Sequence, residues 1–167
     1  MAAYLYAAPA GVPGDITRVD ETNVEPAKLI ANSGTFAQAF GIPMKYATGG
    51  ITQMGAGDAA TDFAGVLIRE VPSISGNTNQ GLDDTTPNPD QVQGLAVRGY
   101  VSVKCKQGTP ARGGVVYVRV EADTGKAVGD FEAVSDTTKS VALTATQATW
   151  ASDGKDADNN AELRIAR

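Results

Sequence analysis

The longest regular pattern in the sequence is an alternation of residue types between positions 95 and 105. The odd positions carry small or apolar residues, Leu95, Val97, Gly99, Val101, Val103 and Cys105, between Ala96, Arg98, Tyr100, Ser102 and Lys104. A period of two places successive side chains on opposite faces of an extended strand. The pattern therefore predicts one long strand with its odd-numbered face buried, and a sheet in which to bury it.

Shorter segments extend this sheet. Further strands are expected at 116–121, 128–133, 141–145 and 162–165, with ADTGK (122–126) as a turn between two of them. In the N-terminal half, AGVLIREV (64–71) is typical of a buried strand and PMKYA (43–47) of a weaker one, whereas EPAKLIAN (25–32) fits either a short helix or an extended segment. GNTNQGLDDTTPNPD (76–90) has no periodicity and is expected to be a long loop.

Short strands separated by turn residues are typical of antiparallel sandwiches and barrels. The 167 residues include 42% hydrophobic and 20% charged residues, which is the composition of one globular domain. We therefore expect a mainly β fold, an antiparallel β-sandwich or small β-barrel with long loops. Residues 1–14 are expected to form an extended N-terminal arm, and residues 15–167 a single β-rich domain.

Charge and composition argue against several functional classes. The net charge is -5, and no basic run carries interleaved aromatic residues, so a nucleic-acid partner is not expected. The chain has no histidine, the commonest general base and transition-metal ligand, and its one cysteine allows no intrachain disulfide. No apolar run reaches the roughly 20 residues of a membrane span, and the apolar start lacks the basic region of a signal peptide. We expect no enzyme activity, no cofactor and no membrane partner.

The stretch DGKDADNNAELRI (153–165) is dense in oxygen ligands and could suggest a calcium loop. From Asp156, the first, third and fifth positions are Asp156, Asp158 and Asn160, as in an EF-hand. However, Ala161 stands where that loop has glycine, and Arg167 stands where it has a bidentate glutamate. Asp and Asn form turns without any metal, so we expect a polar turn and no metal site.

Three other motifs are better explained by structure than by chemistry. Asp123-Thr124-Gly125 has the sequence of an aspartic-protease loop, but a single copy with charged neighbours is typical of an exposed hairpin turn. Gly55, Gly57 and Ala60 match a dinucleotide fingerprint without the strand and helix that it needs, so a loop is expected. Cys105 is expected to be a buried structural thiol, and Trp150 a core or interface residue.

Longer strings carry a resemblance to a family. They are PAGVPGDITR (9–18), FAGVLIREVPSISG (63–76), PNPDQVQGLAVRGYVSVKC (87–105), GDFEAVSD (129–136) and WASDGKDADNNAELRI (150–165). Together they resemble the structural cement, or capsid decoration, proteins of tailed bacteriophages. The resemblance implies a virion protein, made in the bacterial cytoplasm, that binds the outer surface of an assembled capsid and stabilises contacts between capsomers. It also implies the major capsid protein as partner, and a homo-oligomer, either trimer or dimer.

Tyr4, Leu5 and Tyr6 are the candidate residues for the capsid or subunit interface, because aromatic residues are common interface anchors. The loop at 76–90 would support them. The alternative is that the arm pairs with its own sheet as an edge strand. A different function, a β-rich binding module of a phage tail or fibre that recognises a receptor or glycan, would need clustered exposed aromatics. Aromatic residues are only 6% of the chain and are scattered, which argues against that module.

Overall fold

The structure is a computed structural model that describes residues 11–69, 86–136 and 138–166. The elements, in chain order, are η1 (Val19–Glu21), β1 (Asn23–Lys28), β2 (Pro43–Ala47), β3 (Gly50–Gln53), η2 (Ala60–Asp62), β4 (Phe63–Leu67), β5 (Val92–Gln107), β6 (Tyr117–Arg119), β7 (Phe131–Glu132), β8 (Ser140–Ala142), β9 (Ala148–Trp150) and β10 (Asn160–Ile165). The two η elements are single 3-10 turns, so the mainly β prediction is confirmed. Within the described ranges, no helix is long and apolar enough to cross a membrane.

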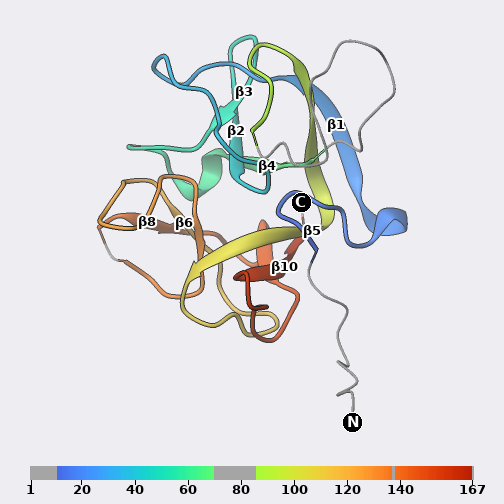
Figure 1. Cartoon of the computed structure of the whole chain (residues 1–167), viewed down its shortest axis with the longest axis vertical. Helices are drawn as coiled ribbons and strands as arrows, with labels where there is room; N and C mark the ends of the chain where they lie inside the picture. The colour runs from blue at the N-terminus through green and yellow to red at the C-terminus, as the bar shows by residue number, and fades with distance from the viewer. Residues whose placement is uncertain (1–10, 70–85, 137, 167) are drawn as a thin grey trace.

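The molecule has two parts, one with strands β1–β4 and the other with strands β6–β10, and the long strand β5 joins them (Figure 1). Its first half pairs antiparallel with β1 and β4, in the part that also holds β2 and β3. Its second half pairs antiparallel with β10 and parallel with β7. Across the described strands the path β3-β2-β4-β5-β7-β6-β8 is open, with no closure into a barrel. The sheet is mixed because of the β5–β7 pair, whereas the other named strand pairs are antiparallel.

The alternation that predicted β5 is interrupted at Gly99. Leu95 packs in one core cluster and Ala96 in the other, but beyond Gly99 it is the odd-numbered Val101 and Val103 that join Ala96 in its cluster. Gly99 has a φ of +119°, in the region that favours glycine. The odd-numbered residues are buried as predicted, apart from the half-buried Val97, but they face two different cores. The strand switches faces at Gly99 and serves two cores.

The two cores differ in size and position. The larger lies between the two parts of the sheet and includes Phe63, Val66, Val101, Val103, Cys105, Val118, Phe131, Trp150, Leu163 and Ile165. The smaller lies on the other face of β2–β5 and consists of Leu29, Ala37, Phe40, Met44, Ile51, Ala64, Leu67 and Leu95. Cys105 is a buried free thiol, and the Trp150 Nε1–H donates to the Val115 carbonyl at 3.1 Å. Both residues lie in the larger core, as expected.

The remaining element predictions have mixed outcomes. The segment 43–47 is a strand, and of the segment 25–32 the extended alternative is correct for residues 25–28, which belong to β1. Two strands were missed, Gly50–Gln53 and Ala148–Trp150, because neither is long enough to show a periodic pattern. The turn at 123–126 and the loop after Gly55 are confirmed by backbone hydrogen bonds. Of the predicted loop at 76–90, residues 76–85 lie outside the described ranges.

Candidate functional site

Tyr4, Leu5 and Tyr6 lie outside the described residues, but the root of their arm, residues 11–18, is described. The Gly14 N–H donates to the Ser102 carbonyl at 2.8 Å, and the Ser102 N–H donates to the Asp15 carbonyl at 2.8 Å. Ile16 forms an antiparallel bridge with Val101. These bonds attach the arm root to β5, so the boundary predicted after residue 14 falls inside a segment that is fixed to the sheet.

Side chains hold the end of the arm root on β10. Arg18 donates from Nε and Nη2 to the two carboxylate oxygens of Glu162 at 3.1 and 3.0 Å, and Thr17 Oγ1 donates to the same carboxylate at 2.7 Å. The Arg18 guanidinium also lies 3.9 Å from the ring centre of Tyr100. The hydrogen bond with Glu162 raises the pKa of Arg18. A two-pronged pair of this kind fixes orientation as well as position.

Arg18→Ala is expected to lower the free energy of unfolding by about 1 kcal/mol, because Arg18 is partly solvent-screened. Arg112→Ala is the matched control, since Arg112 Nε lies 4.0 Å from Asp153 and both side chains are more than two-thirds exposed. Urea unfolding followed by Trp150 fluorescence measures both values. Equal losses in the two variants would contradict a structural role for the Arg18–Glu162 pair.

The arm root lies beside the point where the chain leaves the described domain at residue 69. The Arg69 N–H donates to the Gly14 carbonyl at 2.9 Å. The packing is tight here, since a Cβ on Gly14 would lie 2.7 Å from Phe40 Cβ and 2.9 Å from the Arg69 nitrogen. The two segments expected to contact a partner, the arm and the one that leads into the loop at 76–90, therefore depart from one place.

A groove of about 760 Å³ opens at the arm root. Its apolar lining comes from Val12, Pro13, Ala39, Phe40 and Ile42, and its charged lining comes from Arg69, Lys104, Lys106, Asp130, Asp156 and Asp158. Gly11, Gly41, Gly129 and Asn160 complete it. We call it the arm groove. Six segments that are far apart in the sequence converge to form it, so its apolar floor and charged rim could not be recognised from local patterns.

The acidic turn borders the arm groove, and its geometry explains its composition. The Asp156 carboxylate accepts from the backbone N–H groups of Asp158 and Asn160 at 2.9 and 2.7 Å, and from Asn160 Nδ2 at 3.1 Å. Asn159 has a φ of +66°. This is an Asx turn, as expected, in which the carboxylate organises the backbone. Among the described residues, no three His, Cys, Asp or Glu side chains are grouped to hold a metal ion.

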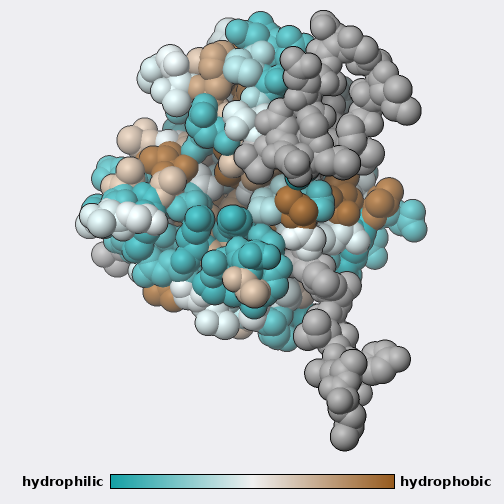
Figure 2. Space-filling view, viewed as in Figure 1, coloured by the Kyte–Doolittle hydropathy of each residue, from teal (hydrophilic) through white to brown (hydrophobic). Residues whose placement is uncertain are grey.

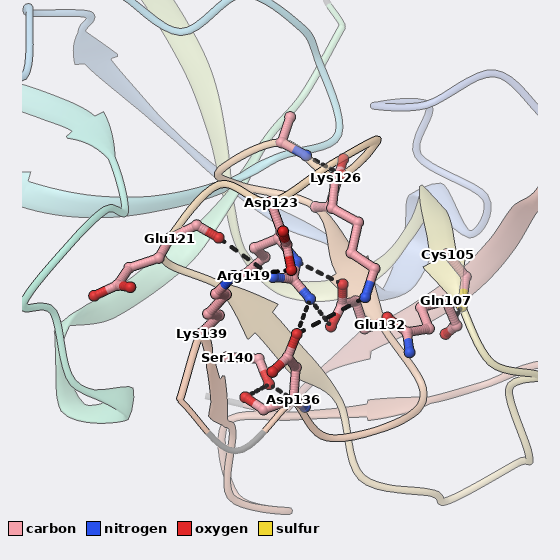
Figure 3. A network of polar contacts seen from close by, with 12 residues as sticks. Cys105, Gln107, Arg119, Glu121, Asp123, Lys126, Glu132, Asp136, Lys139 and Ser140 are labelled. Carbon is pink, nitrogen blue, oxygen red and sulfur yellow. Dashed lines mark hydrogen bonds and ion pairs between the residues drawn. The ribbon is translucent and has the colours of Figure 1, made fainter.

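A buried ion cluster joins the loops around β6–β8, and the sequence analysis missed it. Figure 3 shows Arg119 between two carboxylates: it donates to Glu132 at 2.7 and 3.2 Å and to Asp136 at 2.9 Å. The side chains of Arg119 and Glu132 are both fully buried. Buried charges of this kind are structural when they are fully paired.

Asp123 lies at the edge of this cluster and has none of the features of a protease aspartate. Its carboxylate is 41% exposed and lies 2.8 Å from Lys139 Nζ. The hydrogen bond from Lys139 lowers the pKa of Asp123. An exposed carboxylate paired with a lysine differs from the proton-sharing aspartate dyad of that class.

On the face seen in Figure 2, the described residues form no large apolar patch. Figure 2 shows a mostly hydrophilic face with hydrophobic groups in small, separate areas. Among the described residues, the large hydrophobic side chains with most exposure are Val12, Val19, Val24, Tyr46, Val92, Val115 and Val134. Isolated exposed valines need no functional explanation. The arm groove and the arm that begins in its wall are therefore the strongest candidate interaction site.

Sequence comparison identifies the family. The sequence model of the XM1 gp53 minor capsid protein matches residues 1–165. The chain belongs to the XM1 gp53 minor capsid protein family. A chain in a solved structure, the capsid of Myoviridae phage XM1, is similar over 98% of this chain and 97% of that one, with a TM-score of 0.65 and 20% identity. At that identity the likeness shows the fold alone. No protein with a curated function matches significantly.

Membership in this family confirms the resemblance to phage capsid-associated proteins that the sequence strings indicated. It supports a structural role in the virion, in association with the capsid, and a non-enzymatic one. A structural role is consistent with the two polar clusters described above, the buried Arg119 cluster and the Asp156 turn, whose hydrogen bonds hold loops in place.

Proposed function

We propose that this protein is a cement, or decoration, protein that binds the outer surface of the assembled phage capsid and stabilises contacts between capsomers. The observation that carries the proposal is the match to a minor capsid protein family over residues 1–165. A ligand that binds an assembled lattice better than its separated parts stabilises the lattice by mass action. Many copies on one shell multiply a weak contact through avidity.

The major capsid protein is the proposed partner, and Tyr4, Leu5 and Tyr6 are the proposed anchors at the capsid or subunit interface. The structure supports an arm that starts from a fixed point, since residues 14–18 are attached to β5 and β10. A fixed root leaves fewer residues to order on binding, which lowers the entropic cost of association. A closed homo-oligomer, trimer or dimer, would match the local symmetry axes of an icosahedral shell.

Deletion of residues 2–8 tests this assignment. We expect shell binding to weaken about tenfold or more, because truncation of buried aromatic anchors costs about 2 kcal/mol or more each. Thermal unfolding of the described domain should be almost unchanged, since the arm root and its bonds to β5 remain. Co-sedimentation with shells that lack the protein measures binding, and circular dichroism measures unfolding.

Arg112→Ala, an exposed change on another surface, is the control for nonspecific loss of binding. Unchanged shell binding after the deletion would remove the arm from the interface. A large fall in the midpoint of unfolding would show instead that the arm is an edge strand of its own domain.

A further inference from the structure

We propose that the arm groove is the docking site for the N-terminal arm of a neighbouring copy of this chain. This inference rests on the proposed homo-oligomer and deepens it, because it assigns Tyr4, Leu5 and Tyr6 to the subunit interface. Each copy would present an arm from its root and receive another arm in the groove beside that root.

The groove has the chemistry to hold an apolar peptide. Val12 is 46% exposed in its wall, and Phe40 and Ile42 form apolar surface next to the smaller core. Clefts that bind ligands usually combine an apolar lining with a few placed polar groups. Here Lys104 and Lys106, both exposed, supply cations at the rim.

One polar atom at the groove lacks a partner. Asn160 lines the groove, is 6% exposed, and its Oδ1 atom is buried with no hydrogen-bond partner among the described residues. A buried acceptor without a donor costs about 1–3 kcal/mol. A bound peptide brings backbone N–H groups, and a tyrosine brings a hydroxyl, and either could supply the missing donor after a small adjustment of the side chain.

The arm has a matching composition. Residues 1–10, MAAYLYAAPA, contain no charged side chain, and Tyr4, Leu5 and Tyr6 are its large side chains. Tyrosine provides an apolar ring together with a polar hydroxyl, which suits an apolar floor with a polar rim. The anchors precede Gly11 by five to seven residues, which when extended span at most about 17–25 Å.

We assign the arm in the groove to a second copy because of residues 7–10, the spacer between the anchors Tyr4, Leu5 and Tyr6 and the arm root. Residues 7–10 separate Tyr6 from Gly11, and Pro9 favours extended backbone at its own position and at Ala8. A spacer of this composition favours contact of the anchors with another copy over a return to the groove whose wall contains Gly11 and Val12. Reciprocal exchange between two copies closes a dimer, and head-to-tail exchange closes a ring when the rotation between copies allows it.

The first experiment measures binding of an arm peptide to the groove in the absence of phage shells. A fluorescent peptide with the sequence of residues 1–10 is titrated into the chain that lacks residues 2–8. We expect saturable binding that Val12→Glu weakens at least tenfold. Val115→Glu is the matched control, because Val115 is 49% exposed and does not line the groove. Circular dichroism confirms that both variants are folded. Absence of saturable binding, or equal binding by the two variants, would overturn the proposal.

The second experiment identifies which copy supplies the arm that occupies the groove. In a Cys105→Ala background, a chain carrying Leu5→Cys is mixed with one carrying Ala39→Cys and oxidised. We expect a covalent heterodimer, with none when Val115→Cys replaces Ala39→Cys. A chain carrying both Leu5→Cys and Ala39→Cys that closes only on itself would show docking within one copy and would overturn the exchange. Neither experiment uses capsids, so failure here is distinct from failure of capsid binding.

Discussion

Gly99→Ala is expected to lower the free energy of unfolding by about 3 kcal/mol or more, through backbone strain and overpacking together. Gly99 has a φ of +119°, where side chains are strained. A Cβ would also meet Thr22 Oγ1 and Cα, and would lie 2.7 Å from the Glu21 carbonyl oxygen. The change acts where β5 switches between the two cores, so neither part of the sheet can relax independently. Urea unfolding followed by circular dichroism measures the loss.

Gly125→Ala measures the cost of backbone strain at a glycine where an added Cβ meets no steric overlap. Gly125 also has a positive φ, +75°, but a Cβ there would meet nothing within 4 Å. Its cost should stay near the roughly 1 kcal/mol expected of strain alone. Equal losses at Gly99 and Gly125 would show that the face switch in β5 is not a tightly packed feature of the fold.

Glu132→Ala is expected to be the most damaging change outside the apolar cores, with a loss of about 3–5 kcal/mol. Its carboxylate and the Arg119 guanidinium are both fully buried, at 2.7 Å. Removal of Glu132 leaves Arg119 with Asp136 as its remaining carboxylate partner, at 2.9 Å, and that partner is partly exposed. Burial disfavours the charged form of Arg119, but the hydrogen bonds to the two carboxylates outweigh it and raise its pKa.

The double variant Arg119→Met with Glu132→Leu tests whether the cost comes from the orphaned charge. Apolar replacement of a whole buried pair is often close to neutral, so the double variant should be more stable than Glu132→Ala. If the two substitutions add, the charges do not act as a pair. Chemical denaturation of the single and double variants at one pH measures the coupling.

Low pH is expected to lower the free energy of unfolding through protonation of Asp136. The hydrogen bond from Arg119 lowers the pKa of Asp136, so the folded-state pKa lies below the unfolded one. The stabilisation is present above the unfolded value of about 4 and is lost as the pH falls through the lowered pKa. Asp136→Asn, which removes the titrating group, should flatten the pH dependence of stability below about pH 4. An unchanged acid profile would show that Asp136 titrates as if it were unpaired.

The sequence predicted much of the fold because its strongest pattern is also its central element. The period of two at 95–105 identified β5, and the turn residues at 123–126 and 153–160 identified two tight turns. It could not identify the face switch, because glycine fits the small-residue side of an alternating pattern equally well in a straight strand. It also could not place Arg119 in the interior, since its partners Glu132 and Asp136 are 13 and 17 positions away.

The sequence did not predict the arm groove. The family strings included the arm root, PAGVPGDITR, and the acidic turn, but not their meeting point. The arm groove depends on tertiary contacts, such as the Arg69–Gly14 and Gly14–Ser102 hydrogen bonds, that bring residues 11–13 beside residues 39–42 and 104–106. Tyr4, Leu5 and Tyr6 remain a prediction from composition and position alone.

Co-sedimentation with cognate phage shells that lack this protein, before and after their expansion, tests the central claim most directly. We expect saturable binding to expanded shells and little to unexpanded ones, because a cement protein stabilises the state that it binds better. That result would couple its binding free energy to capsid maturation. The absence of saturable binding to either form would contradict a cement role on the outer surface.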